Sequence, residues 1–292
     1  MTSVTATETP DDARPFYKPW QEDLHADFFD ALQDWSDDAI RCHYEAFNDI
    51  QLLKSTWPRF SNRLLLEIGC ATGDLFRYLS SSLPELSYLG SDISTPAVNR
   101  ARQKYPAGQF TVVDTALSNL SDQPQRPGIL YCKDVVLHQI DPFGFIEKLL
   151  NLPEEAAIIR LRTRDKGQTQ LNPDISCQHH YSGWVPYMVL NIEETIDCIS
   201  KTRAIKRIEI VRNHMILGGL EARFLPKECY EPETGTAETA ILVEFDRNGV
   251  ETATPEIIIR DQKEVPPPFT LWHRVRRQLR LRLPGARAVF HN

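Results

Sequence analysis

One segment of the chain, residues 64–74, constrains the fold more than any other. It opens with three leucines, Leu64–Leu66, and an apolar run of this kind is typical of a parallel strand that is covered on both faces. Gly69 and Gly73 follow, and a residue without a side chain lets a ligand approach the backbone closely. Apolar residues then recur at helical spacing beyond Asp74. The segment therefore predicts a strand, a ligand-binding turn and a helix.

The glycine spacing separates this turn from the turn of dinucleotide-binding enzymes. Their fingerprint, G-x-G-x-x-G, would require a glycine at position 74, but the second glycine of this chain comes one position earlier, at Gly73. Glu67 precedes the turn, and Ala71 occupies its middle. The segment resembles the first motif, E/D-x-G-x-G-x-G, of the class I S-adenosylmethionine (SAM) methyltransferases.

Three later segments extend this resemblance in the order that the family has them. A short apolar strand ends in Asp92, about 20 residues after the glycine turn, and a carboxylate there can accept both ribose hydroxyls of a nucleoside. A β-branched run ends in Asp114, and in the family this acid and its neighbour's amide address adenine. Residues 129–142 resemble the strand and the Arg-Asp segment of small-molecule methyltransferases. The resemblance implies that SAM is bound by Glu67, Gly69, Ala71, Gly73, Asp92, Ile93, Asp114, Thr115, Lys133 and Asp134.

The resemblance covers roughly residues 55–250 and implies an α/β fold. The expected class I methyltransferase sheet is seven-stranded, mostly parallel and doubly wound, and its last two strands form an antiparallel hairpin. The expected strands are residues 63–68, 86–92, 108–113, 128–133, 155–163, 206–217 and 238–246, and the expected helices are 73–83, 95–105, 115–121, 141–151 and 192–203. The expected regions are a disordered N-terminus (1–14), a helical lid (15–58), a SAM-binding domain (59–250) with an acceptor insertion (165–189), and a Pro-rich linker with a basic amphipathic tail (251–292).

Composition and charge limit the class of protein. The chain has 292 residues, of which 41% are hydrophobic, and this is enough for one large domain with its own core. Its net charge of −7 argues against nucleic acid as a partner, and no apolar run approaches the roughly 18 residues of a membrane span. The six cysteines form no C-x-x-C pair, and the polar first residues lack the features of a signal peptide. We therefore expect a cytoplasmic enzyme without a bound metal.

The connection after the fifth strand is expected to bind the acceptor. Arg160, Arg162 and Arg164 alternate with apolar residues, so they lie on one side of the strand and must meet solvent, acidic partners or an anionic ligand. The polar and aromatic insertion that follows is long, and long loops at the carboxyl end of a parallel sheet are commonly functional. The alternative is that its aromatic residues only close a surface loop. The expected acceptor-binding residues are Arg162, Arg164, Tyr181, Trp184 and Tyr187.

Three histidines are candidates for a general base. Methyl transfer mainly requires that the acceptor atom is placed against the methyl carbon in a desolvated pocket, and a base helps when the acceptor is a hydroxyl. His138 lies just beyond the fourth strand, beside the expected methyl position, whereas His179 and His180 lie in the insertion. In the family the position of His138 often shapes the site without acting as a base, so we expect His180 or His179 to be the base. A purely structural role is the alternative for each of them.

The segment after the fourth strand also bears on the acceptor. The Asn/Asp-Pro-Pro-Tyr/Phe motif, typical of nitrogen methylation of bases and amides, is replaced here by Cys132–Val135. We expect O-methylation of a hydroxylated small molecule, sugar or glycan, by similarity to bacterial enzymes of glycan and secondary-metabolite synthesis. Nitrogen and carbon acceptors are alternatives. So are a catalytically silent protein that uses the SAM fold for interactions, and a hydride-transferring enzyme.

The N-terminal segment, residues 15–58, is rich in aromatic residues. In the family such a segment often lies across the cofactor as a lid, and its rings can cover adenine or an acceptor. The alternative is ordinary packing of these rings against the edge of the sheet.

The tail, residues 269–292, carries six arginines and no acidic residue, whereas the rest of the chain is acidic. Trp272, Val275 and Leu279 can share one face of a helix with the arginines around them, which suits an anionic membrane surface or an acidic partner. The expected location is therefore cytoplasmic, with peripheral contact at the inner membrane face as one option. The alternative is that the tail packs on the chain's own acidic domain.

Removal of the tail should abolish binding to anionic vesicles. Each basic residue near an anionic bilayer contributes roughly 1 kcal/mol. Exposed charges are screened over about 10 Å at 0.1 M ionic strength, so binding should weaken as salt is added. Sedimentation with phosphatidylserine liposomes at low salt compares the full chain with a chain that ends at Glu264. A full chain that stays in the supernatant would exclude the membrane role.

Overall fold

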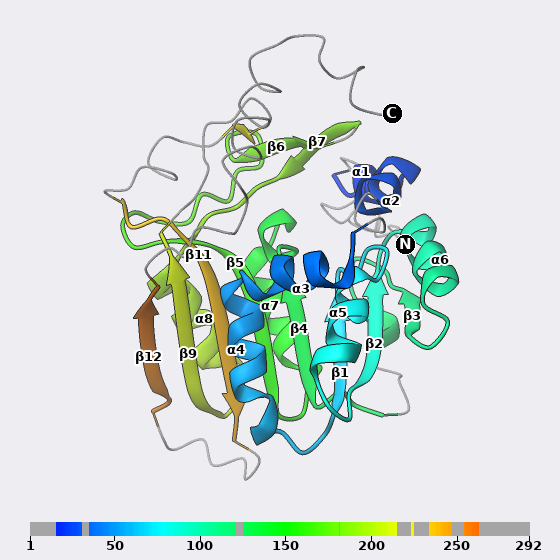
Figure 1. Cartoon of the computed structure of the whole chain (residues 1–292). Helices are drawn as coiled ribbons and strands as arrows, with labels where there is room; N and C mark the ends of the chain where they lie inside the picture. The colour runs from blue at the N-terminus through cyan, green and yellow to red at the C-terminus, as the bar shows by residue number, and fades with distance from the viewer. Residues whose placement is uncertain are drawn as a thin grey trace, which may run out of the picture.

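A central sheet of nine strands organises the molecule (Figure 1). The computed structural model describes residues 16–30, 35–120, 125–180, 182–214, 223–224, 234–246 and 254–262. The strands of the central sheet are β1 (Leu64–Ile68), β2 (Ser87–Asp92), β3 (Gln109–Val112), β4 (Ile129–Lys133), β5 (Ala156–Arg164), β8 (Leu190–Asn191), β9 (Ile205–Asn213), β11 (Ala237–Phe245) and β12 (Glu256–Asp261). Their order is β12-β9-β11-β5-β4-β1-β2-β3, and β8 pairs with β5.

The sheet confirms the expected fold and corrects its strand count. Strands β1 to β5 run parallel to one another, and β11 lies between β5 and β9, antiparallel to both, as expected for the closing hairpin. The short β8 and the edge strand β12 are additional to the seven predicted strands. β12 lies in the segment that the sequence assigns to the linker, and it pairs in parallel with β9. A six-residue strand gives little periodic signal by itself, and only the edge of β9 supplies its backbone partner.

The helices lie largely where the sequence predicts them. The exception is the helix expected at 115–121, which is wrong, because the described part of that segment forms only a single 3₁₀ turn. The α-helices are α1 (Lys18–Gln21), α2 (Asp23–Asp30), α3 (Asp37–Glu45), α4 (Asn48–Thr56), α5 (Asp74–Ser82), α6 (Thr95–Lys104), α7 (Pro142–Leu150) and α8 (Ile192–Thr202). The 3₁₀ turns are η2 (Trp57–Arg59), η3 (Ser118–Leu120) and η4 (Val136–His138).

Side-chain caps explain where several of these helices begin. At the start of α6, the Ser94 hydroxyl accepts a hydrogen bond from the Ala97 amide. At the start of α7, the Asp141 carboxylate accepts a hydrogen bond from the Gly144 amide. The Asn191 side chain accepts two amides at the start of α8. Each cap satisfies backbone donors that have no partner within the helix.

The core is divided between the two faces of the sheet. One cluster of buried side chains joins the sheet to α7 and α8, and a second joins it to α4, α5 and α6. In Figure 1, α4 and α5 lie in front of the sheet, and α7 and α8 lie behind it. The residues of β1 are buried on both sides, as expected for a central parallel strand. The ends of the central strands are therefore held rigidly in place.

The acceptor insertion forms a small separate sheet rather than an irregular loop. Strands β6 (Cys177–His180) and β7 (Gly183–Pro186) belong to the insertion, and β10 (Arg223–Phe224), from later in the chain, completes the sheet in the order β10-β6-β7. This hairpin stands above the carboxyl end of β5, and α1 packs against β7 (Figure 1). Two segments that are distant in sequence thus meet above the same edge of the central sheet.

Some expectations fall on segments that the structure does not describe. These are the N-terminal segment 1–14 and the basic tail 269–292. Among the helices in the described segments, none has the length and apolar character to cross a membrane.

Glu67, a residue of β1, is buried. Only 5% of its surface is exposed, and the Tyr88 hydroxyl on β2 donates a hydrogen bond to its carboxyl group. Burial raises the pKa of Glu67 to about 8, although the bond from Tyr88 acts in the opposite direction. The Glu67 side chain is therefore largely protonated at neutral pH.

Glu67→Gln should make stability less sensitive to alkaline pH. The unfolded chain loses this proton near pH 4.5 and the folded protein only near pH 8, so the folded state holds the extra proton between these values. The free energy of unfolding of the wild-type protein should fall across this window by up to about 1.4 kcal/mol per pH unit. Thermal unfolding measured at about pH 5.5 and pH 8.5 compares the two proteins. The stability of Glu67→Gln relative to the wild type should be greater at the higher pH.

The matched control is Glu147→Gln, which removes the charge of an exposed carboxylate on α7. Its difference from the wild type should not change with pH. If Glu67→Gln behaved in the same way, the buried and protonated state of Glu67 would be contradicted.

Candidate functional site

A cavity of about 430 Å³ opens at the carboxyl ends of β1, β2 and β4. This is the position where open α/β sheets bind their ligands. Within the described segments no group of three or more His, Cys, Asp or Glu residues can hold a metal ion. The predicted site residues that line the cavity are Gly69, Ala71, Asp92, Ile93, Asp114, Thr115, Lys133, Asp134, His138, Arg162, His180 and Tyr187. Those that do not line it are Glu67, Gly73, Arg164, His179 and Trp184. Tyr181 lies outside the described residues.

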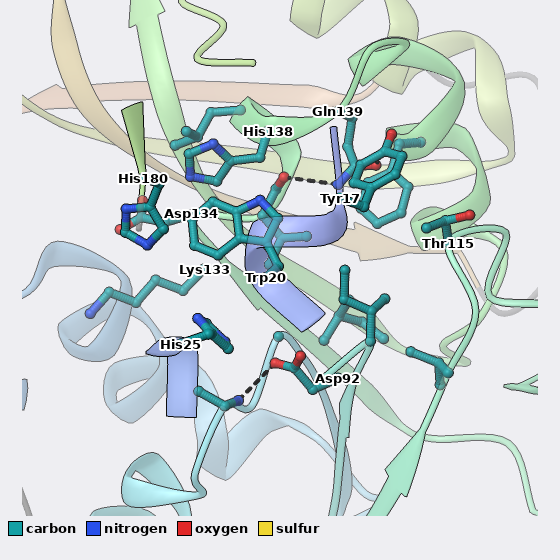
Figure 2. A pocket seen from close by; sticks show the side chains of 18 of the residues that line it. Tyr17, Trp20, His25, Asp92, Thr115, Lys133, Asp134, His138, Gln139 and His180 are labelled. Atoms are coloured by element: carbon teal, nitrogen blue, oxygen red, sulfur yellow. Dashed lines mark hydrogen bonds between the residues drawn. The ribbon is translucent and has the colours of Figure 1, made fainter. Parts of the chain in front are cut away.

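The glycine turn after β1 is shaped for a closely approaching ligand. Gly69 has a φ of 84°, and a Cβ at this position would lie 2.4 Å from Cγ2 of Val135, so only glycine fits. The Ala71 amide donates to Oδ2 of Asp92 at 2.9 Å (Figure 2). The Ser94 amide donates to Oδ1 of the same carboxylate at 2.8 Å. Asp92 thus ties the turn to the start of α6. Each carboxylate oxygen of Asp92 can still accept a hydrogen bond from a ribose hydroxyl, because a carboxylate oxygen has two lone pairs.

Asp114 and Thr115 line the cavity after the neighbouring strand, β3. The Ser118 amide donates to Oδ1 of Asp114 at 2.9 Å, and this backbone hydrogen bond lowers the pKa of the carboxyl. Acidic groups therefore follow two adjacent strands, β2 and β3, and both carboxylates are anchored by backbone amides. This arrangement fits the ribose and the adenine of a nucleoside, and SAM contains both.

Two predicted cofactor residues support the turn from outside the cavity. The Glu67 carboxyl bonds to Tyr88. Gly73, with a φ of 84°, begins α5, and a Cβ there would lie 2.9 Å from the Phe110 ring. The motif in the sequence does not distinguish residues that touch a ligand from residues that shape the turn around it.

A cluster of buried charges lies at the end of β4. Asp134 has a left-handed backbone, with a φ of 58°. Its carboxylate forms ion pairs with the guanidinium groups of Arg160 at 2.5 Å and Arg162 at 2.8 Å. Burial opposes ionisation, but the two guanidinium groups hold the pKa of Asp134 well below its usual range. Glu238 on β11 pairs with both arginines, and Asp49 on α4 lies 3.3 Å from Arg160. Two of the three arginines on β5 therefore meet the protein's own carboxylates.

Arg164, the third arginine, does not reach the cavity. It is 4% exposed, and among the described residues its Nε and Nη1 have no hydrogen-bond partner. Gly167 packs close to its guanidinium group. The structure thus separates Arg164 from Arg162, which does line the cavity.

Lys133 is held by aromatic rings rather than by a carboxylate. Its Nζ lies 3.4 Å from the ring centroid of Phe47 and 5.7 Å from that of Tyr44, and both rings come from the N-terminal helical region. Burial lowers the pKa of the Lys133 ammonium group, and Asp49 partly opposes this effect. A cationic side chain therefore lines the cavity with two aromatic rings beside it.

Two of the three candidate histidines lie in the cavity, and both contact Trp20 of α1 (Figure 2). The ring centroid of Trp20 is 4.7 Å from that of His138 and 4.2 Å from that of His180. His179 is exposed and contacts Trp184 with a centroid distance of 5.1 Å. Neighbouring residues of a strand point to opposite sides, so β6 can direct only one of its two histidines into the cavity.

The hydrogen bonds of these two histidines determine their tautomers. His138 Nδ1 lies 2.7 Å from the Pro186 carbonyl oxygen, which can only accept, so Nδ1 carries the proton and Nε2 carries the lone pair. His180 Nδ1 lies 3.2 Å from the side-chain nitrogen of Gln178, which donates to it, so a neutral His180 carries its proton on Nε2. Of the two, His138 has the tautomer that suits a base at Nε2.

The aromatic residues of the insertion are divided between the cavity and the surface. Tyr187 is 2% exposed, and its ring lies 5.9 Å from that of His138. Trp184 is 45% exposed and lines a neighbouring open groove beside α1.

Sequence reasoning missed the individual lid residues that enter the site. These are Tyr17, whose hydroxyl donates to Gln139 at 3.3 Å, Trp20 on α1, and His25, Phe28 and Phe29 on α2. Burial lowers the pKa of His25, and the charge of Asp92 acts against this. The aromatic composition of residues 15–58 was a signal for the region. Helices of four and eight residues show too little periodicity to indicate which side chains face the cavity.

Comparisons with known proteins agree with this geometry. The model of a family described as "Methyltransferase domain" matches residues 66–152. The protein named "Putative methyltransferase 235L" from Invertebrate iridescent virus 6 is 22% identical over 127 residues, which are 44% of this chain and 48% of that protein. The chain therefore spans about half the length of this curated relative.

Two solved structures are similar at low sequence identity. Magnesium protoporphyrin IX methyltransferase from Synechocystis PCC 6803 with bound SAM gives a TM-score of 0.47 at 12% identity, over 83% of this chain and 100% of that chain. The 1,6-didemethyltoxoflavin-N1-methyltransferase from Burkholderia thailandensis gives 0.48 at 12% identity, over 84% and 94%.

The family match covers residues that line the cavity at the ends of the central strands. Residues 66–152 contain the glycine turn, Asp92 and the segment after β4. The strand order reverses between β1 and β4, and the cavity opens at that point. Residues 66–152 of this chain thus match a methyltransferase domain, and the α/β sheet around them has the expected class I methyltransferase topology.

Proposed function

We propose that this protein transfers a methyl group from SAM to an oxygen atom of a hydroxylated small molecule, a class that includes sugars and glycans. The observation that carries the proposal is the bond between His138 Nδ1 and the Pro186 carbonyl, because it leaves the lone pair on Nε2 of a cavity residue. SAM supplies an electrophilic methyl group on a sulfonium. The protein must place the acceptor and remove its proton.

The cofactor side of the cavity is assigned from its charges. Asp92 is assigned to the ribose hydroxyls, and Asp114 with Thr115 to the adenine edge. Lys133 is assigned to the carboxylate at the methionine end, because among the described residues no carboxylate lies within ion-pair distance of its ammonium group. Gly69 leaves room for the ligand beside the turn.

The acceptor side is assigned to His138 as general base. As the acceptor oxygen bonds to the methyl carbon, the carbon–sulfur bond breaks with its electrons going to sulfur, and the hydroxyl proton goes to His138 Nε2. The sequence favours His180 or His179 for this role. The tautomer of His180 and the exposed position of His179 support His138 instead.

Other acceptors and other roles make different predictions. A nitrogen or carbon acceptor would depend less on His138, and a silent interaction module would bind SAM without any turnover. A cytoplasmic location, and contact between the tail and an anionic membrane, belong to the same proposal. They rest on composition alone.

Asp92→Asn should weaken SAM binding by about 10- to 100-fold, because hydrogen bonds to a charged acceptor contribute about 1.5–3 kcal/mol. Calorimetry with SAM measures the affinity. The matched control is Asp38→Asn, which removes an exposed carboxylate whose side chain is 85% exposed, and it should bind like the wild type. Unchanged affinity in a folded Asp92→Asn protein would contradict the assignment.

His138→Asn should lower turnover by about 100-fold while SAM affinity stays nearly constant. The asparagine amide can still donate to the Pro186 carbonyl, so the substitution removes mainly the basic Nε2. The readout is labelled-methyl transfer to hydroxylated acceptors.

His179→Asn and His180→Asn complete the set. His179→Asn is the control outside the cavity and should keep full activity. A loss of about 100-fold in His180→Asn, with His138→Asn unaffected, would transfer the role of base to His180.

A further inference from the structure

The acceptor half of the cavity contains a flat side chain from the lid. Trp20 lies against two imidazoles from separate elements, His138 after β4 and His180 on β6 (Figure 2). Its plane is tilted by 36° from that of His180 and by 48° from that of His138. The indole therefore fills a space whose walls are two polar rings, one of which is the proposed base.

We propose that the acceptor is a planar aromatic compound with a ring hydroxyl, and that its ring takes the place of the Trp20 indole beside His138 and His180. The inference rests on the proposed function, because it deepens the acceptor class of the same site. A space that accepts an indole accepts another flat ring of similar size. A sugar in the chair form is thicker than an aromatic ring and would have to push the two imidazoles apart.

The two imidazoles would then have separate roles. His180 lies closer to the indole and nearer to parallel, and Gln178 holds its Nδ1, so it can act as a stacking wall. His138 is more inclined to the indole, and the Pro186 carbonyl fixes its other nitrogen. A hydroxyl on the edge of a ring in this position can therefore reach His138 Nε2 without stacking on it.

Trp20 lies on helix α1, which can move to let a ligand ring replace the indole. Helix α1 has only four residues, and helices this short gain little stability from their own backbone. Its N-cap residue, Tyr17, makes no side-chain cap bond. The His25 ring lies edge-on to the indole, with ring centroids 5.4 Å apart. Phe28 and Tyr187 lie against the two imidazoles, at 6.3 Å from His180 and 5.9 Å from His138. A flat ligand that enters would thus exchange one set of ring contacts for another.

Removal of the indole tests whether the space is suited to a flat ring. Calorimetry with indole as the probe compares the wild type with Trp20→Ala, and the variant should bind indole at least about tenfold more tightly, as engineered cavities bind matching rings. The matched control is Trp184→Ala, which removes an exposed indole on β7, outside the cavity, and should behave like the wild type. Trp20→Ala combined with His180→Ala should lose most of the gain. Equal binding by the wild type and a folded Trp20→Ala protein would overturn the proposal.

Turnover by the wild-type protein gives a second test that needs no variant. With SAM present, labelled-methyl transfer to a hydroxyindole should exceed transfer to methyl glucoside by at least about tenfold, the factor that corresponds to 1.4 kcal/mol. Methylation of the glucoside but not of the hydroxyindole would overturn this inference and leave the proposed function intact. Failure to bind SAM would overturn the proposed function, whatever the result with indole.

Discussion

The site depends on one carboxylate, that of Asp92, which accepts two backbone amides from different segments. The Ala71 amide comes from the turn after β1, and the Ser94 amide comes from the start of α6. Ala71 has a left-handed φ of 45°, which is unfavourable for a residue with a side chain. The bond to a charged, buried acceptor stabilises this conformation. The same residue thus shapes the turn and is available to a ligand.

The charge cluster around Asp134 solves a different problem at the end of β4. Arg160 and Arg162 lie on one side of a strand that is buried along its whole length. A buried charge without a partner is strongly unfavourable, so the carboxylates of Asp134, Glu238 and Asp49 are a requirement of the fold. They come from a loop, a strand and a helix that are distant in sequence. The cluster fixes the backbone immediately before His138.

The proposed acceptor side is assembled from three separate segments. Trp20 comes from the N-terminal helices, His138 from the turn after β4, and His180 from the hairpin inserted after β5. The short helix α1 packs against β7, so the lid and the hairpin position each other. The cofactor side, in contrast, is built from consecutive strand ends of one rigid sheet.

The sequence by itself determined the fold class, the parallel strands from β1 to β5, and the turn and acids at their ends. These features follow from local patterns: an apolar run gives a buried strand, and the carboxyl ends of parallel strands must share one edge of the sheet. Only the tertiary structure decided that β12 joins the sheet, that Arg160 and Arg162 meet internal acids, and that His138 and His180 lie in the cavity while His179 does not. It also decided the tautomer of His138, which depends on a carbonyl 48 residues away. Such contacts join segments that are distant along the chain, and no local pattern records which partner the fold will bring to a side chain.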